Sequence, residues 1–262
     1  MRPLARLADV IKKSRRAAEH SSMYVTVDLV IFTVLQDALQ VLLIERGNEP
    51  YLGRWALPGG YVRDAETLDE AALRELDEET GIDGRRLHLE QLRAYSDPHR
   101  DPRGRIITVA YLALGPELPL PTAGTDARAA RWIPVTSLVD SQGTLAFDHD
   151  VILRDALEQA RSRLEYSTVA AAFCPEPFTV GDLRHVYEVI WGVALDPSNF
   201  RRKVTHAESF LVPTGERRYP EVGRPAALYR RGAARLLIPP LLRSSDVTGT
   251  GTSRVAAVRR ER

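Results

Sequence analysis

Cysteine and long apolar runs are nearly missing from this chain of 262 residues, and each shortage excludes a class of protein. The single cysteine, Cys174, excludes an intramolecular disulfide framework and is typical of a reducing compartment, so we expect a cytoplasmic protein. Because Cys174 has no neighbour at metal-ligand spacing, inert packing is the preferred interpretation. No apolar run approaches the roughly 20 residues that a transmembrane helix needs, which predicts no membrane partner.

The net charge of +1 conceals an uneven distribution of charge along the chain. Residues 23–150 contain 12 Lys and Arg against 21 Asp and Glu, whereas residues 176–240 contain 10 against 7. Residues 241–262 contain 5 against 2. The first half therefore favours polyanions only through a metal ion, whereas the second half can bind them directly. The length allows one large or two modest domains.

Both ends of the chain have compositions that argue against packed structure. The basic stretch 1–22 lacks the apolar core of a signal peptide, and its acidic Asp9 and Glu19 argue against a transit peptide. We predict a mobile or weakly helical extension there. Residues 241–262 mix Ser, Thr, Gly and Arg with few apolar residues, which predicts a disordered tail.

The most informative pattern lies between residues 60 and 82. Three carboxylates, those of Glu75, Glu78 and Glu79, have the spacing that places them on one helix face, where each like-charge pair costs about 0.2–0.5 kcal/mol. A solvated acidic face is the plain alternative. The further residues at fixed spacing on either side of these carboxylates favour a bound cation over a solvated face. Hard oxygen ligands suit Mg²⁺. The full pattern is Gly60, five residues, Glu66, seven residues, and Arg74-Glu75-Leu76-Asp77-Glu78-Glu79-Thr80-Gly81-Ile82.

The surrounding residues predict how this helix is built. Leu68, Ala72 and Leu76 recur every four residues and form an inward stripe. Gly81 stands where a helix favours a left-handed residue at its end. The turn-forming run 57–60 would lay backbone N–H groups beside the acidic face. Such a corner suits a diphosphate, with N–H donors on one side and metal-bound carboxylates on the other.

Alternating β-branched residues predict a mixed sheet sandwiched by helices, which is an α/β fold. We expect a hairpin over 24–46 with its turn at Asp37-Ala38, and a helix over 148–167. The Cys174–Pro177 run breaks structure, so a domain boundary is predicted between 165 and 177. Further strands are expected near 87–96, 105–114 and 131–133.

From residue 178 the pattern predicts a winged helix-turn-helix domain. Thr179 and Asp182 form a capping-box pattern, and Gly192 ends that helix. Asp196-Pro197 begins a second helix, which is basic. Residues 209–213 and 226–229 are expected to form the two strands of a wing, joined by the loop 214–223.

The basic helix favours duplex DNA as a partner, although a solvated or protein-binding face is the alternative. Asn199 and Arg202 lie within one turn and are the residue types that pair with adenine and guanine edges. Arg217 and Arg218 are expected at the wing tip, within reach of phosphates. The predicted DNA contacts are Thr179, Ser198, Asn199, Arg201, Arg202, Lys203, His206, Arg217 and Arg218.

The pattern over 60–82 is identified as a Nudix box, and it is complete. Residues 95–114 and 145–150 resemble Nudix proteins of the ADP-ribose type. Residues 178–190 together with 199–203 resemble the Nudix-related transcriptional regulators, NrtR. The resemblance covers residues 23–232 and implies a Nudix domain over 23–147, a linker helix and connection over 148–176, and a winged helix-turn-helix over 177–240.

The resemblance implies a bacterial homodimer, cytoplasmic and nucleoid-associated, that represses genes of NAD metabolism. ADP-ribose or a related NAD metabolite would be the effector and an operator the DNA partner. Glu75, Glu78 and Glu79 would bind Mg²⁺ if the protein is a hydrolase, with Glu66, Arg74 and Glu78 as the catalytic set. The candidate ligand contacts are Arg46, Arg54, Trp55, Gly59, Gly60, Arg100, Arg103 and Arg105.

Two other functions remain open at this point. The intact box supports an active Mg²⁺-dependent pyrophosphatase of ADP-ribose or nucleoside diphosphates, carrying an appended DNA- or protein-binding module. An RNA-associated protein is the weaker alternative, because residues 196–235 lack aromatic platforms for stacked bases.

Overall fold

The computed structural model describes residues 22–81, 84, 87–116, 118, 127–139, 143–219 and 224–243. The chain forms two compact units, Met1–Gln159 and Ala160–Arg262. The division falls within helix α4 (His149–Tyr166), before the predicted boundary between 165 and 177. The last turns of α4, from Ala160 onward, belong to the second unit and contact its residues. The Arg161 side chain donates to the Ile190 carbonyl, and the Trp191 indole donates to the Arg161 carbonyl.

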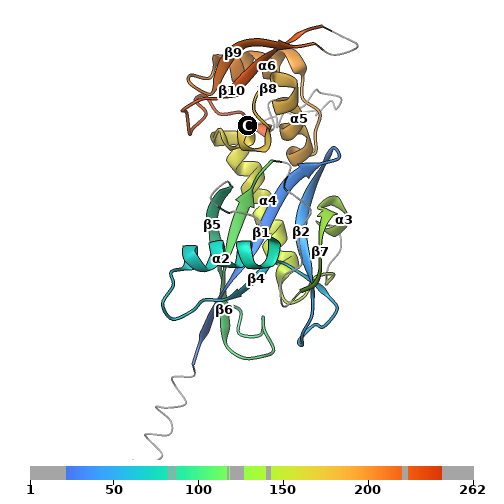
Figure 1. Cartoon of the computed structure of the whole chain (residues 1–262), viewed down its shortest axis with the longest axis vertical. Coiled ribbons are helices and arrows are strands. Elements are labelled where there is room, and N and C mark those ends of the chain that lie inside the picture. The colour runs from blue at the N-terminus through green and yellow to red at the C-terminus, as the bar shows by residue number, and fades with distance from the viewer. Residues whose placement is uncertain are drawn as a thin grey trace, which may run out of the picture. The chain divides into compact units, whose positions relative to one another are not determined.

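A seven-stranded sheet forms the centre of the first unit (Figure 1). Its main path runs β3-β2-β1-β6-β5, with β4 paired to β1 and β7 paired to β2. The β1–β6 pair is parallel and the other pairs are antiparallel, so the predicted mixed sheet is confirmed. The strands are β1 (Tyr24–Leu35), β2 (Ala38–Arg46), β3 (Trp55–Ala56), β4 (Gly59–Tyr61), β5 (His88–Tyr95), β6 (Ile106–Leu114) and β7 (Ala127–Pro134).

The hairpin between β1 and β2 turns one residue earlier than predicted. Gln36 and Asp37 adopt φ angles of 51° and 60°, and Ala38 already pairs with Leu35. Two consecutive left-handed residues give the turn whose twist matches that of the flanking strands. The predicted turn at Asp37-Ala38 is therefore corrected to Gln36-Asp37.

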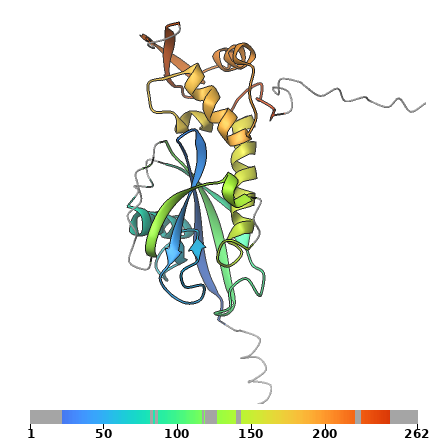
Figure 2. The ribbon, with the colours of Figure 1, turned by 90° about the vertical axis from the view of Figure 1, so that its right-hand side faces the viewer.

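Helix α2 (Leu68–Thr80) carries the acidic pattern. A capping box between Thr67 and Glu70 begins it, and Gly81 at φ 66° ends it as predicted. Ala72 and Leu76 are fully buried in the sheet core, and Leu68 packs against that core, which confirms the inward stripe. Figure 2 shows the sheet lying between α2 and the first part of α4, as the expected sandwich requires. The short helix α3 (Thr136–Val139) follows β7.

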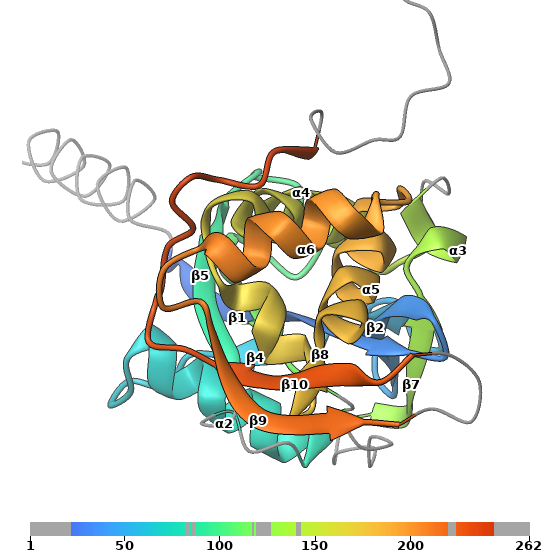
Figure 3. The same ribbon diagram turned by 90° about the horizontal axis from the view of Figure 1, so that it is seen from above.

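The second unit contains the predicted pair of helices and a small sheet (Figure 3). Thr179 and Asp182 form the capping box of α5, Gly192 ends α5 at φ 71°, and Asp196 caps α6. Phe200 of α6 is buried against Tyr187 of α5, with ring centroids 5.2 Å apart. The elements are η2 (Val169–Phe173), β8 (Phe178–Thr179), α5 (Val180–Trp191), α6 (Pro197–His206), β9 (Leu211–Arg218) and β10 (Ala226–Arg231).

The wing is longer than the sequence pattern predicted. Strand β9 continues through Pro213 and Gly215 to Arg218, and the short β8 extends the hairpin to a three-stranded sheet in the order β8-β10-β9. Arg217 and Arg218 pair with Ala227 and Ala226, so they lie at the end of a strand and not in the predicted loop.

Three expectations from composition concern Cys174, membrane-spanning segments and the two ends of the chain. Cys174 is buried, as the packing interpretation requires, and this burial raises the pKa of its thiol to about 12. Within the described part of the chain, no helix is long and apolar enough to cross a membrane. The predicted N-terminal extension, apart from Ser22, and the predicted tail beyond Arg243 lie outside the described residues.

Candidate functional site

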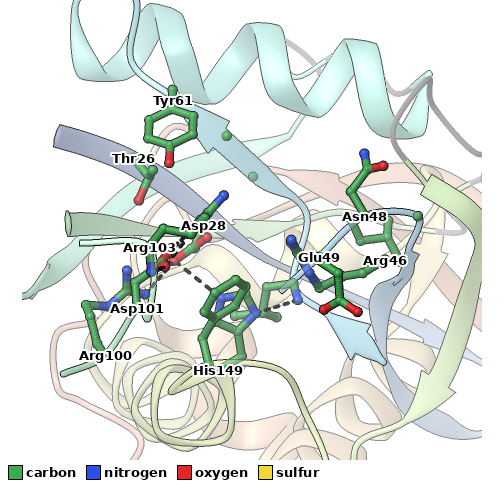
Figure 4. Close-up of a pocket in the computed structure, with 16 residues that line it drawn as sticks. Thr26, Asp28, Arg46, Asn48, Glu49, Tyr61, Arg100, Asp101, Arg103 and His149 are labelled. Carbon is green, nitrogen blue, oxygen red and sulfur yellow. Dashed lines mark hydrogen bonds and ion pairs between the residues drawn. The ribbon is translucent and has the colours of Figure 1, made fainter. Parts of the chain in front are cut away.

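A polar pocket opens beside β4 in the first unit (Figure 4). Strands β1, β2 and β4 form one wall, and the loops around residues 100–103 and 147–149 form the other. Cationic, acidic and aromatic side chains meet there, which is the mixture that a charged nucleotide-like ligand requires. The lining residues are Thr26, Asp28, Ile44, Arg46, Gly47, Asn48, Glu49, Leu57, Gly59, Gly60, Tyr61, Arg100, Asp101, Arg103, Phe147 and His149.

A buried ion network forms the floor of this pocket. The Arg100 side chain is only 3% exposed and donates to both carboxylate oxygens of Asp148, at 2.7 and 3.0 Å. It also lies 3.3 Å from Asp28. Asp148 directly precedes α4, and its carbonyl accepts from the amides of Val151 and Ile152. The network therefore joins the pocket to the first turn of α4.

His149 completes this network as a neutral side chain. Its Nδ1 accepts a hydrogen bond from the Leu57 amide at 2.9 Å, which places the ring proton on Nε2. Nε2 faces the Asp28 carboxylate at 3.6 Å. Burial lowers the pKa of His149 below its ordinary value of 6.5, although Asp28 opposes this shift. The ring thus holds the turn before β4 against the pocket floor.

Arg74 organises the acidic face of α2. Its guanidinium contacts both oxygens of Glu66, at 2.6 and 2.9 Å, and donates through Nη1 to Glu75 at 2.6 Å and Glu78 at 3.1 Å. Arg63 also contacts Glu78, at 3.2 Å. Because one nitrogen of Arg74 reaches both Glu75 and Glu78, these two carboxylates converge on the same point. Arg74 thereby fixes the orientation of both carboxylates.

The converging carboxylates fit a hard divalent cation. Glu75 is largely buried, and this desolvation raises its pKa, which is the condition that a bound cation relieves. Gly60 leaves room for the Glu75 carboxylate, because a Cβ at that position would overlap its oxygens. Among the described residues no three acidic, His or Cys side chains form a complete cage, and the side chain of Glu79 lies outside the description.

Gly60→Ala should therefore displace the Glu75 carboxylate. We expect a loss of about 1–3 kcal/mol in the free energy of unfolding, since the added methyl group overpacks the corner. Urea denaturation measures it. In a Glu75→Ala background the clashing oxygens are gone, so the same substitution should cost little. An equal loss in the free energy of unfolding in both backgrounds would contradict the overlap between the added methyl group and the Glu75 carboxylate.

The hydrogen bonds from Arg74 lower the pKa of Glu66 from its ordinary value of 4.5 to about 2. This stabilisation is present above the unfolded pKa and is lost as the pH falls through the folded one. Glu66→Gln should flatten the decline of the free energy of unfolding between the unfolded and folded pKa values of Glu66. Urea unfolding from about pH 6 to about pH 2 measures this decline. Asp77→Asn, on the exposed side of α2, is the control and should keep the wild-type decline.

The predicted ligand contacts divide into two groups. Gly59, Gly60 and three of the arginines line the pocket, whereas Arg54, Trp55 and Arg105 do not. Arg54 donates to the Gly143 carbonyl, and Arg105 donates to the Ser96 carbonyl at 2.7 Å. The Trp55 ring lies beside Arg131, at 5.7 Å. These three side chains therefore lie outside the pocket lining in this structure. The lining arginines are Arg46, Arg100 and Arg103.

Sequence reasoning missed the acidic and aromatic half of the pocket. In the sequence, Asp28 is a single polar residue within the predicted hairpin over 24–46, and Asp101 lies between two arginines, so neither stands out as a pocket residue. Phe147 and His149 lie in the 145–150 segment that resembled the ADP-ribose type, which was the available signal. The missed lining residues with polar or aromatic side chains are Thr26, Asp28, Asn48, Glu49, Tyr61, Asp101, Phe147 and His149.

In the second unit, α6 presents its basic face to solvent. Arg201 and Arg202 are exposed and Lys203 is half-buried, while Phe200 and Val204 point into the core. The Arg202 guanidinium donates to the Asn199 side-chain oxygen at 2.8 Å. His206 contacts the Arg202 carbonyl through Nδ1 at 2.7 Å. Ser198 is exposed at the start of the helix.

Two predicted DNA contacts have other partners in the structure. The Thr179 hydroxyl accepts from the Asp182 amide in the capping box, and the residue is buried. Arg218 forms an ion pair with Asp182 at 2.8 Å. Both residues thus hold the start of α5 in place. Arg217 is exposed and remains the candidate phosphate contact of the wing.

The fold and the site together define a class of protein, a Nudix domain followed by a winged-helix DNA-binding domain. The sequence matches the NUDIX domain over residues 25–156 and the NrtR DNA-binding winged helix domain over residues 170–231. The chain belongs to the NrtR family, which confirms the resemblance and the predicted fold class.

Relatives with known roles are similar to most of the chain or to part of it. The ADPR responsive transcriptional repressor NtrR of Acinetobacter baylyi is 35% identical over 81% of this chain and 84% of its own length. The crystal structure of Shewanella oneidensis NrtR complexed with a 27mer DNA is 34% identical, with a TM-score of 0.70, covering 83% of this chain and 99% of that one. The ADP-ribose pyrophosphatase of Methanocaldococcus jannaschii is 37% identical over 56% of this chain and 81% of its own.

Proposed function

We propose that this protein is a cytoplasmic transcriptional repressor of NAD-metabolism genes. It binds operator DNA as a homodimer, and ADP-ribose or a related NAD metabolite in the pocket releases it. The observation that carries this proposal is the presence, on one chain, of a charged pocket beside the Nudix helix and an exposed basic α6. The repressor from Acinetobacter baylyi, similar over most of its length, supports the same combination.

The pocket chemistry suits a nucleoside diphosphate joined to a second sugar. Arg46 and Arg103 can donate to phosphate oxygens, and Gly59 and Gly60 also line the pocket. The exposed carboxylate of Glu49 is an acceptor for ribose hydroxyl groups. Tyr61 and Phe147 supply aromatic faces for a base. ADP-ribose contains all three kinds of group.

The DNA face suits the major groove. Helix α6 extends its basic side chains away from a buried apolar stripe, as a recognition helix does. We assign phosphate contacts to Ser198, Arg201 and Lys203, and a guanine edge to Arg202. A dimer would present this helix twice, one half-site apart.

Coupling between ligand and DNA follows from the position of Arg100. An anionic ligand in the pocket competes with Asp148 for this guanidinium, and Asp148 precedes α4. Helix α4 is continuous from the first unit into the second. A change at its first turn can therefore alter how the second unit is presented, which gives the ligand the differential affinity that a switch requires.

A gel shift with the DNA upstream of the protein's own gene tests the proposal. We expect a retarded complex that ADP-ribose dissociates and that ribose 5-phosphate, at the same concentration, leaves intact. Failure to bind that DNA under low salt, or binding that ADP-ribose leaves unchanged, would contradict the repressor function.

A second function is favoured by one observation: Glu75 and Glu78 converge beside Gly60, in a chain similar to an ADP-ribose pyrophosphatase. Glu75, Glu78 and Glu79 would hold Mg²⁺, which polarises a phosphoryl oxygen and activates water. Arg74 would keep the carboxylates in place, with Glu66 fixing Arg74. A hydrolysis assay with Mg²⁺ on wild type and Glu79→Gln decides. No metal-dependent turnover of any nucleoside diphosphate by wild type excludes this function.

A further inference from the structure

A second arginine contacts the acidic face of α2, from the turn that precedes the helix. The Arg63 guanidinium lies 3.2 and 3.4 Å from the two carboxylate oxygens of Glu78. Arg74 donates to the same carboxylate at 3.1 Å. Glu78 is thus paired with two guanidinium groups through the oxygens that a hard divalent cation would bind. A metal ion at this carboxylate must therefore replace one of these contacts.

The two arginines differ in how firmly they are held. The Arg74 side chain is 16% exposed and reaches Glu66 and Glu75 as well as Glu78. The Arg63 side chain is 62% exposed, and its partner Glu78 is 48% exposed. Water screens an exposed ion pair, so such a pair is weak and opens easily. Arg63 is therefore the contact that an entering cation displaces, while Arg74 stays in place.

The backbone of Arg63, in contrast to its side chain, is fixed beside the acidic face. Its amide donates to a Glu66 side-chain oxygen at 2.7 Å, and the Glu66 amide donates to the Arg63 carbonyl at 3.1 Å. Arg74 in turn holds Glu66 at 2.6 and 2.9 Å. The turn before α2 therefore keeps the guanidinium within reach of Glu78, and a tethered group of this kind competes at a high effective concentration.

We propose that Arg63 is an internal competitor of the divalent cation at Glu78. The cation displaces the Arg63 guanidinium when it binds, which lowers the apparent affinity of the site. This inference rests on the second proposed function, namely the metal site of Glu75, Glu78 and Glu79, and adds a residue that sets how tightly the metal is held. A weakly held metal leaves the bound diphosphate intact for longer, which suits a domain that senses its ligand.

Titration of the full chain with Mn²⁺, followed by the electron paramagnetic resonance of the free ion, tests the competition. Mn²⁺ suits the same oxygen ligands as Mg²⁺. Arg63→Ala should tighten Mn²⁺ binding by about twofold to fivefold, which corresponds to the strength of an exposed ion pair. Arg63→Gln, which keeps part of the aliphatic stem without the charge, should give the same gain.

Two controls separate the contact from the charge. Asp64→Asn changes the local net charge by one unit in the same turn, at an exposed neighbour of Arg63. It should leave the Mn²⁺ dissociation constant near the wild-type value. Arg93→Ala breaks a comparable exposed ion pair, with Asp155 of α4, and should also leave that constant near the wild-type value.

Two results would overturn the competition while leaving the metal site intact. One is wild-type affinity for Mn²⁺ in both Arg63 variants. The other is an Asp64→Asn variant that weakens binding by the factor by which Arg63→Ala strengthens it, because the site then responds to local charge alone. Thermal unfolding checks that each variant is folded. If neither the wild type nor the Arg63 variants bind Mn²⁺, the proposed metal site fails together with this inference.

Discussion

Replacing Arg202 by alanine is expected to weaken operator binding by about tenfold to a hundredfold and to relax specificity at one base pair. The residue is exposed on α6, and Asn199 holds its guanidinium at 2.8 Å. This contact uses one of the five N–H donors, which leaves enough for a bidentate contact with a guanine edge. Gel shifts against operators with single base changes measure the effect.

Arg217→Ala provides the contrast. We propose a phosphate contact for this exposed arginine at the end of β9, so its loss should weaken binding to all sequences alike. The slope of log affinity against log salt should fall by about one. Arg230→Ala removes one exposed positive charge elsewhere in the same unit and controls for net charge. An unchanged salt slope in both the Arg202 and the Arg217 variant would count against the proposed docking of α6 and the wing on DNA.

The second large effect is expected at Asp148. Asp148→Asn removes the charge from the bidentate partner of Arg100, at the residue that precedes α4. We expect operator binding without ligand to stay close to wild type, while the effect of ADP-ribose on it falls from the typical range of about 5- to 150-fold toward none. DNA binding measured across an ADP-ribose titration gives both quantities.

Asp155→Asn is a matched control for this experiment. Asp155 lies on the same helix and also pairs with an arginine, Arg93, but Arg93 does not line the pocket, whereas the Asp148 partner Arg100 does. It should keep the wild-type response to ADP-ribose. If the two variants respond alike, the coupling does not begin at the Arg100–Asp148 contact.

Local signals along the chain predicted most of the fold. The caps at Thr179 and Asp196 and the helix ends at Gly81 and Gly192 were confirmed, because each depends on the chemistry of a few adjacent residues. The wing was mispredicted for a tertiary reason. Pro213 resembles a strand breaker, but β9 is an edge strand of its sheet, where a missing N–H donor is tolerated.

The candidate site was less predictable, because its residues come from distant parts of the chain. Asp28, Arg100 and Asp148 meet only after β1, the loop before β6 and the start of α4 are brought together. Arg54 and Trp55 lie close to the pocket in the sequence, but Arg54 donates to the Gly143 carbonyl and the Trp55 ring lies beside Arg131. Arg218 is predicted at the wing tip, and the fold adds an ion pair with Asp182 that the sequence does not reveal. Charge along the chain indicates a class of ligand, whereas partners are decided by the fold.

Thermodynamic reciprocity tests the central claim most directly. If ADP-ribose in the pocket weakens DNA binding, bound operator must weaken ADP-ribose binding by the same factor. Isothermal titration of ADP-ribose into the full chain, alone and saturated with operator DNA, gives both dissociation constants. We predict a weaker constant in the presence of operator, by the factor seen in the DNA titration. Equal constants would contradict a repressor switched through this pocket.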